Sequence, residues 1–511
     1  SLQPYTGTVY VGLIENPSYV AGAGGANQAL CDGAQTSSPQ AVVFNGETQK
    51  TIGFSYPEAH KGLGFKVSFG EEGNLQHVCS RDPGGFAVRP ASYTFETDSN
   101  LFGGDTYTLT IKVEDTGNNP TTYYTQSSNK IDAKMELDVP AGCALPAWNQ
   151  PIPLTGAFIN GTLTYLSFSY SNVGDIKVTV EDEDWTSVDQ GSVNGKGYDD
   201  CIVGSYSNVP AGGKVGCNVS KEETFSFVAT KFENTASFIN AQPFYYTSGG
   251  NGVSPTLQIS TQALLSDDTV ATNYTQSCFA NNINTDLTLA VAPQTLKDII
   301  AYLPDNNTLV ANNEDVTIST LENEFNAGMA DVRIFFNFSR QVNTTHEPFR
   351  IFLGDFNVTS IADSSGLTGV DFDRTLNVDH NATFYYGRVH APDQRFWGKS
   401  GAARVHYEVY CKDCNRTDFN ATGTASPDTL YWFQNDFHDN LADGNVTLFN
   451  SVGNVRFSNA NYGAAPATAQ TTAVANGLET QNLIINQTPY TDRIRFTPSS
   501  WLIHDPFDSN A

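Results

Sequence analysis

Polar and apolar residues alternate along much of the chain. The alternation is clearest in segments rich in Val, Ile, Thr, Tyr and Phe, which are residues 7–14, 107–115, 175–183, 331–339 and 403–411. A period of two places successive side chains on opposite faces of an extended strand. Turn clusters such as "DTGNNP", "GGNGVSP" and "DSSG" separate the segments. The pattern predicts an all-β protein built of tandem immunoglobulin-like or jelly-roll β-sandwich domains with few short helices.

Helical patterns are rare. The segment "PQTLKDIIAYL" (293–303) carries Pro near its start, and "STLENEFNAG" (319–328) combines a Ser cap, a Glu three residues later and a terminal Gly. These are start and stop signals of helices, so the sequence predicts a short helix at each of these two places.

One stretch of sequence recurs. "TLTIKVEDTGNNPTTYYTQSS" begins at Thr108 and "TLQISTQALLSDDTVATNYTQSC" begins at Thr256, and both read as strand, polar turn and Tyr-Thr-Gln-Ser. A repeated supersecondary unit at this spacing predicts two related sandwiches. The predicted domains are residues 1–145, residues 146–290, which resemble the first, and a β-rich C-terminal domain, residues 291–511.

The charge of the chain excludes several classes of partner. The 511 residues include 54 acidic and 27 basic ones, for a formal net charge of −27. Nucleic acids and anionic membranes require clustered Lys and Arg, so neither is an expected partner. The sequence also lacks a run of 18 apolar residues, so no membrane span is expected.

Cysteines and glycosylation sequons favour an exported protein. The eight cysteines allow complete pairing, for which we predict the disulfides 31–79, 143–278, 201–217 and 411–414. Twelve Asn-x-Ser/Thr sequons are present, and five carry Asp two positions earlier, where chance placement predicts about one. This arrangement resembles the acceptor of Campylobacter-type oligosaccharyltransferases. The expected glycosylation sites are these five asparagines: Asn357, Asn381, Asn415, Asn420 and Asn445.

The pair Cys411 and Cys414 in "CKDCNRTDFNAT" permits three interpretations. A c-type haem site would need His at Asn415, and a zinc site would need two further Cys or His nearby in the sequence. A thioredoxin-like dithiol would need a following helix, which "NRTDFNATG" does not resemble. The sequence favours a short-loop disulfide, with free thiols and a metal site as the alternatives.

Catalytic motifs are absent from the sequence. It contains no Gly-x-Ser-x-Gly, His-Glu-x-x-His or Gly-x-Gly-x-x-Gly, and "RFWGKSG" (395–401) has Asp393 where a P-loop requires Gly. We therefore expect no catalytic or cofactor-binding residues and no enzymatic activity. The acidic stretches 181–190 and 197–200 indicate either a solvated hairpin or a calcium site. The calcium candidates are five aspartates: Asp182, Asp184, Asp189, Asp199 and Asp200.

Several blocks of the sequence resemble a family. "YTGTVYVGL" (5–13) and "CSRDPGGFAVRPASYTF" (79–95) resemble segments of MshQ-like proteins, which are surface proteins linked to mannose-sensitive haemagglutinin (MSHA) type IV pili. Later similar blocks are "FSYSNVGDIKVTVEDEDW" (168–185), "TNYTQSC" (272–278), "FNAGMADVRIFFNFSR" (325–340), "FYYGRVHAP" (384–392) and "WLIHDPF" (501–507). The spacer at residues 83–85 departs from the family pattern. The resemblance implies an extracellular location at the bacterial surface more than any chemistry.

These observations leave three hypotheses. The first is a secreted, pilus-associated adhesin whose partners are pilus components or host or surface glycans. The second is a self-assembling subunit of an extracellular filament or sheath, with the first strand, residues 5–14, donated to another copy of the chain. The third is a carbohydrate-binding or carbohydrate-active protein. No cofactor is expected under any of them, apart from the possible calcium.

Overall fold

A computed structural model describes most of the chain. The described residues are 3–16, 19–21, 27–29, 31–71, 74–80, 85–146, 150–190, 192–193, 196–197, 200–239, 244–248, 254–289, 299–302, 309–313, 317–370, 381–421, 423, 430–438, 456–460, 465–466, 474–484 and 491–504. The chain divides into two compact units. Unit 1 is Ser1–Ala229 with Leu265–Thr269, and unit 2 is Thr230–Leu264 with Val270–Ala511.

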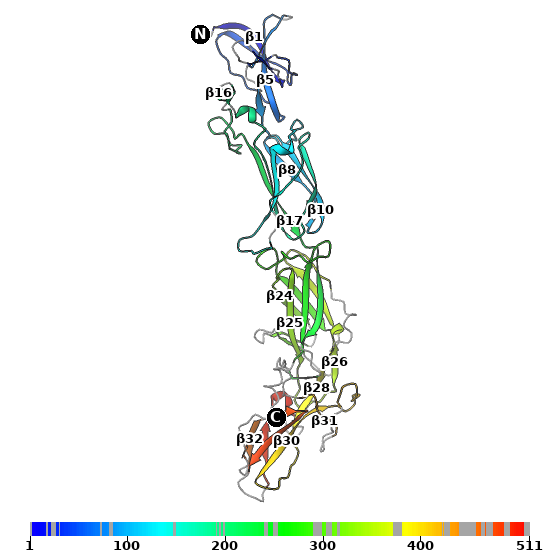
Figure 1. Ribbon diagram of the computed structural model, residues 1–511. Helices are drawn as coiled ribbons and strands as arrows, with labels where there is room; N and C mark the ends of the chain where they lie inside the picture. The colour runs from blue at the N-terminus through cyan, green and yellow to red at the C-terminus, as the bar shows by residue number, and fades with distance from the viewer. Residues whose placement is uncertain are drawn as a thin grey trace. The chain divides into compact units, whose positions relative to one another are not determined.

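Unit 1 is made of mainly antiparallel sheets (Figure 1). Its first sheet has the order β4 (Gln40–Glu47), β1 (Tyr5–Glu15), β5 (His60–Phe69), β6 (Gln76–Cys79), with β7 (Phe86–Val88) also pairing with β5. The second contains β13 (Thr162–Ser169), β10 (Thr106–Glu114) and β8 (Ser92–Glu96). The third contains β12 (Ile152–Pro153), β11 (Ile131–Asp138), β14 (Gly174–Asp182), β17 (Val219–Val228) and, in parallel, β9 (Leu101–Phe102). Smaller elements are the hairpins β2 (Tyr19–Ala21) with β3 (Asn27–Ala29) and β15 (Ser192–Val193) with β16 (Lys196–Gly197), and the 3₁₀ turns η1 (Ser128–Lys130) and η2 (Ser187–Asp189).

The second and third sheets of unit 1 form a β-sandwich. Alternate residues of β10 and β14 are buried, as the sequence pattern predicts. Phe168 of β13 packs against Phe225 and Phe227 of β17, with both ring centroids 5.4 Å away. These contacts join the inner faces of the two sheets.

Unit 2 contains two further layered arrangements. The first has a sheet of β18 (Lys231–Ile239), β20 (Thr256–Leu264), β25 (Met329–Phe338), β22 (Ile299–Tyr302) and β23 (Leu309–Asn313). It also has the sheets β24 (Thr317–Asn323), β21 (Ile283–Leu289), β27 (Phe356–Asp363) and β19 (Tyr245–Tyr246), β28 (Asn381–Tyr385), β26 (Phe349–Phe352), with the 3₁₀ turn η4 (Leu353–Asp355). One core joins these sheets through Ile259, Ile334, Phe336, Leu287, Phe356 and Phe384.

The C-terminal part of unit 2 has its own core. Its main sheet is β29 (Gly387–His390), β30 (Ser400–Tyr410), β35 (Leu478–Ile484) and β33 (Ala465–Pro466), with β31 (Trp432–Gln434) on β30 and β34 (Val474–Ala475) on β35. The strands β32 (Arg456–Ala460) and β36 (Ile494–Thr497) pair separately, and η6 (Ser500–Leu502) follows. Tyr246, Tyr407, Val409, Phe433 and Trp501 contribute to the core.

The all-β prediction is confirmed. Neither segment predicted as a helix is helical in the part that the structure describes. Residues 319–323 belong to strand β24, which pairs with β21, so the helix predicted over 319–328 is wrong. Residues 299–302 form β22, and the rest of the segment up to residue 298, and residue 303, lie outside the described residues. In both segments pairing with neighbouring strands overrides the local capping signals.

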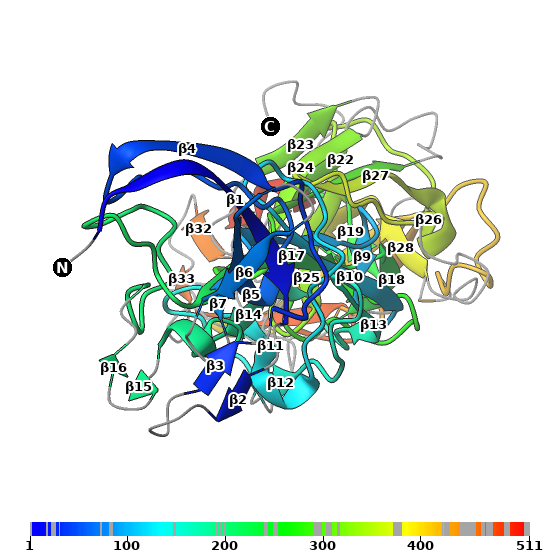
Figure 2. The same ribbon diagram turned by 90° about the horizontal axis from the view of Figure 1, so that it is seen from above.

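Strand pairs cross both predicted domain boundaries. Strand β10 pairs with β13 across the boundary at 145/146, and β20 pairs with β25 across the boundary at 290/291. In each case a strand that follows the predicted boundary pairs with a strand that precedes it. The spacing of the sequence repeat does not reveal this pairing. The first strand, β1, lies between β4 and β5 of its own chain (Figure 2). It is therefore the first strand of its own sheet.

The repeat seen in the sequence is a repeat of structure. In unit 1, Gly161 donates its amide to the carbonyl of Tyr124 over 2.7 Å, and the Val113 amide donates to Gly161 over 2.9 Å. In unit 2, Gly328, Tyr274 and Ala263 make the same two bonds, each 2.9 Å long. The glycine φ angles are 77° and 80°, and the residues before them, Asn160 and Ala327, also have positive φ. We call this arrangement the hairpin lock.

A third hairpin lock occurs in the C-terminal sheet. Gly477 donates to the carbonyl of His438 over 2.8 Å, and the Tyr407 amide donates to Gly477 over 2.9 Å. The φ angle of Gly477 is 70°, and Asn476 before it has a φ of 49°. His438 thus takes the place of the two tyrosines. Each lock requires a left-handed pair of residues ending in glycine, a conformation that glycine adopts without a steric penalty.

Candidate functional site, an acidic cavity in unit 1

A cavity of about 810 Å³ lies in unit 1 beside Cys201. Its size is within the range of roughly 300–1,000 Å³ that is common for ligand pockets. Aromatic, charged and amide side chains line it together. They are Phe65, Phe86, Arg89, Asp115, Asp189, Asp200 and Asn208.

Neighbouring strands and one disulfide fix the wall of the cavity. The rings of Phe65 on β5 and Phe86 on β7 stack with centroids 5.0 Å apart. Arg89 follows β7 and donates to the Asn218 carbonyl and to the side-chain oxygen of Asn208. The disulfide Cys201–Cys217 closes the loop that carries Asn208. The cavity therefore has a defined polar lining on one side and two stacked rings on the other.

Asp189 is the least ordinary of these groups. It ends η2 and is only 5% exposed. The Ala87 amide donates to both of its carboxylate oxygens, over 3.3 and 3.1 Å. Burial, with a smaller contribution from the nearby charge of Asp200, raises the pKa of Asp189 to about 6. A carboxylate held this way is costly to the fold, which is common where a side chain serves binding.

Replacing Asp189 is expected to stabilise unit 1 at neutral pH. Because its pKa is raised in the folded state, ionisation destabilises the fold above pH 6, and the cost disappears when both states are protonated below pH 4. We expect Asp189→Asn to increase the free energy of unfolding by about 1–3 kcal/mol at pH 7 and by little at pH 3. Urea unfolding at both pH values measures this, with Asp98→Asn, at an exposed position outside the cavity, as the control. A variant less stable than wild type at pH 7 would contradict the assignment.

The calcium candidates are divided between two environments. Asp182 is buried and accepts hydrogen bonds from the Tyr124 hydroxyl, the Gln126 amide and the backbone amide of Trp185. Asp184 forms ion pairs with Lys61 and Lys130, 2.7 and 2.8 Å long. Both carboxylates are therefore already engaged by side chains or amides of the protein.

The remaining candidates do not form a described metal site. Asp189 and Asp200 line the cavity, whereas Asp199 lies outside the described residues. Within the described part of the chain, the group of three possible ligands whose atoms lie within 4.8 Å of one another is Glu347, Cys411 and Cys414. Calcium binding by the aspartates stays a prediction.

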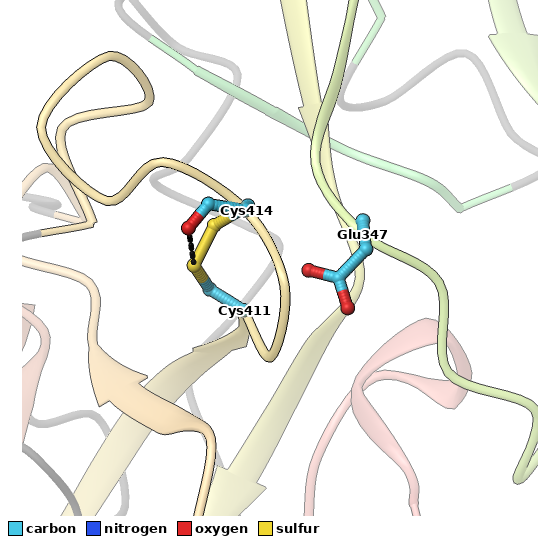
Figure 3. Close-up of side chains that lie close together, drawn as sticks. All are labelled: Glu347, Cys411 and Cys414. Atoms are coloured by element: carbon cyan, nitrogen blue, oxygen red, sulfur yellow. Dashed lines mark hydrogen bonds between the residues drawn. A yellow bond between two sulfur atoms is a disulfide. The ribbon is translucent and has the colours of Figure 1, made fainter.

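Cys411 and Cys414 form a disulfide (Figure 3). Glu347 faces the loop between them, and its two oxygens accept the Lys412 amide over 3.3 and 3.0 Å. Sulfur atoms bonded to each other are not thiolate ligands, so this group does not bind metal as it stands. The disulfide interpretation of the motif is confirmed.

The other cysteines are oxidised as well. Cys31 pairs with Cys79 and Cys201 with Cys217, as predicted. Cys143 and Cys278 are also disulfide-bonded, and the described residues include no free cysteine.

Comparison with known proteins establishes no family. No protein-family model matches the chain, and no curated protein matches it. Three solved structures illustrate what it is similar to. The Escherichia coli adhesin FdeC has 11% identity, covers 80% of this chain and 91% of its own, and gives a TM-score of 0.32. The E. coli alpha-2-macroglobulin has 10% identity, coverage of 97% and 28%, and a TM-score of 0.18. A family 2 β-glucuronidase has 8% identity, coverage of 66% and 37%, and a TM-score of 0.15. Scores this low carry no argument about function.

Four of the five predicted glycosylation sites are in described segments. Asn415 and Asn420 are exposed beside the Cys411–Cys414 disulfide, and Asn357 and Asn381 are half-buried. Asn445 lies outside the described residues. Glycosylation at these positions stays a prediction.

Sequence reasoning missed the cavity, although one signal pointed to it. Phe86 and Arg89 both belong to "FAVRP", which carries the resemblance to MshQ-like proteins, and both line the cavity. Their partners Phe65 and Asn208 come from distant segments. Only the fold shows that they meet.

Proposed function

We propose that this chain is a non-enzymatic adhesin of the bacterial cell surface, associated with pili and recognising host or surface glycans. The resemblance of its sequence blocks to MshQ-like proteins supports the link to pili. Among the described residues, none forms a helix with the length and apolar character that a membrane crossing requires.

The recurrence of the hairpin lock is the observation that carries the proposal. The lock closes three successive β-sheet layers, around Gly161, Gly328 and Gly477. Disulfides occur in sheet regions of both units. Disulfides persist in oxidising compartments outside the cytosol, and tandem β-sandwiches are a frequent architecture of cell-surface proteins. An array of oxidised sandwiches therefore fits a protein that presents a binding surface outside the cell.

The hypothesis of a filament assembled by donation of the first strand receives less support. A donated strand must leave its own sheet, whereas β1 is paired on both sides by strands of the same chain. We do not include strand donation in the proposal.

Surface display and attachment test the proposal together. Antibodies against the purified chain should label intact cells of the producing bacterium, and brief protease treatment of intact cells should remove the label. Deleting the gene should reduce attachment to glycan-bearing surfaces several-fold, and restoring it should recover attachment. Antigen confined to the cytoplasm, or attachment unchanged by the deletion, would overturn the proposal.

A further inference from the structure

The connection between β29 and β30 projects an aromatic tip. Gln394 clamps its base: the side-chain amide donates to the Arg404 carbonyl over 2.9 Å, and the side-chain oxygen accepts the Arg404 amide over 2.7 Å. The next five residues, 395–399, project beyond this clamp, and we call them the tip. The ring of Phe396 lies over Gly401, where an added Cβ would come within 2.2 Å of it. The tip is thus held on β30 at its base.

The tip exposes a tryptophan. Trp397 is 103% exposed, whereas Trp185, Trp432 and Trp501 are buried. Phe396 beside it is 38% exposed. An exposed Trp on a fixed loop is typical of a residue that a partner covers, since Trp and Arg dominate the energetics of protein interfaces.

The charge of the tip is opposite to that of the chain as a whole. Arg395 and Lys399 are exposed on either side of Phe396 and Trp397, in a chain with a net charge of −27. A projecting loop has no hollow of its own to enclose a ligand. Its partner must supply a hollow with aromatic and acidic walls.

The cavity of unit 1 has those properties. Phe65 and Phe86 offer stacked rings, and Asp115, Asp189 and Asp200 supply carboxylates. Hydrogen bonds from Asn119 and Gly117 lower the pKa of Asp115, which keeps this carboxylate ionised at neutral pH. The volume of about 810 Å³ is large enough for an aromatic side chain with part of its loop.

We infer that copies of this chain associate by inserting the aromatic tip of one copy into the unit 1 cavity of another. The two surfaces differ, so each contact leaves one tip and one cavity unoccupied. Contacts of this heterologous kind extend into open chains unless the rotation closes a ring. An anionic membrane is a poorer partner, because it offers no hollow with aromatic and acidic walls for the tip. The contact does not depend on the proposed adhesive function.

Complementary variants of the full chain test the inference. Trp397→Ser removes the exposed indole ring of the tip, and Asp200→Lys, at an exposed position, reverses a charge of the cavity. In sedimentation velocity at about 0.15 M salt, which screens the repulsion between two acidic chains, the average mass of wild type should rise with concentration beyond that of a dimer. Each variant alone should remain monomeric. A mixture of the two should form one-to-one dimers and nothing larger, because the only intact tip and the only intact cavity are then used.

Controls separate the contact from folding and from other partners. Leu430→Ser removes another exposed apolar side chain, 79% exposed, and should associate like wild type. Circular dichroism should show every variant folded. A monomeric wild type, association that persists in Trp397→Ser, or a mixture that stays monomeric would each overturn the inference. Wild type that remains monomeric but binds vesicles or soluble glycans through Trp397 would overturn it in favour of those ligands.

Discussion

Asp182→Ala is expected to lower the free energy of unfolding of unit 1 by about 3–5 kcal/mol, since removing one member of a buried charged network leaves its partners unpaired. The Tyr124 hydroxyl, the Gln126 amide and the backbone amides of Asp184 and Trp185 all donate to this carboxylate. Asp182 is 1% exposed, so water does not replace these bonds without opening the core. The Tyr124 ring would also lose the partner that fixes it against Trp185, 4.3 Å away.

Asp184→Ala is the matched control for this prediction. It lies two residues away and pairs with Lys61 and Lys130, but both lysine side chains are about half exposed, at 40% and 47%. Exposed ion pairs contribute about 0–1 kcal/mol, so the loss should be small. Hydrogen exchange of the β14 and β17 amides would measure both variants within unit 1. Equal losses for the two would contradict the role of Asp182.

Acid is expected to weaken unit 2 through two buried histidines. Burial, and to a smaller extent the charge of Arg340, lowers the pKa of His346 to about 4, while burial alone lowers that of His438 to about 3. Above pH 6.5 both residues are neutral in the folded and unfolded states, so neither affects stability. Below pH 6.5 the unfolded chain binds protons that the folded chain does not. Stability should therefore fall by about 1.4 kcal/mol per pH unit for each histidine, or about 5 kcal/mol in total between pH 6.5 and 4.5.

The slope of stability against pH is the measurement that matters here. Urea unfolding of unit 2 at several pH values should give a steep slope for wild type and about half that slope for His346→Gln, whatever the variant costs at neutral pH. His438→Gln, the other buried histidine of unit 2, should likewise give about half the wild-type slope. A slope unaffected by His346→Gln would show that other groups cause the acid sensitivity.

Alternation along the sequence predicted the five strand segments 7–14, 107–115, 175–183, 331–339 and 403–411 correctly, and it also indicated that Asp182 is buried. Ile176, Val178 and Val180 alternate on the buried face of β14, and Asp182 continues the same series. The pattern therefore already placed Asp182 inside, away from solvent and from the other acids of its cluster. The acidic character of residues 181–190 obscured this because adjacent residues of a strand face opposite ways.

Other features depended on contacts that no local pattern contains. The sequence repeat did not include the third hairpin lock for two reasons. His438 stands where the first two locks have tyrosine, and residues 411–431 separate strand β30 from the segment that carries His438. The cavity depends on Arg89 meeting Asn208 and Asn218, more than a hundred residues away. The helix signals at 319–328 failed for the opposite reason, since local preference there yields to pairing with β21.

The hairpin lock also bears on how such a chain diverges. Its bonds run between main-chain atoms, and only the left-handed pair that ends in glycine restricts the choice of residue. A duplicated module would keep its closure while nearly every other position changed. The three locks accordingly share the glycine and the bonding pattern, whereas Tyr-Thr-Gln-Ser accompanies only two of them. Main-chain geometry of this kind can stay the same where sequence similarity is no longer recognisable.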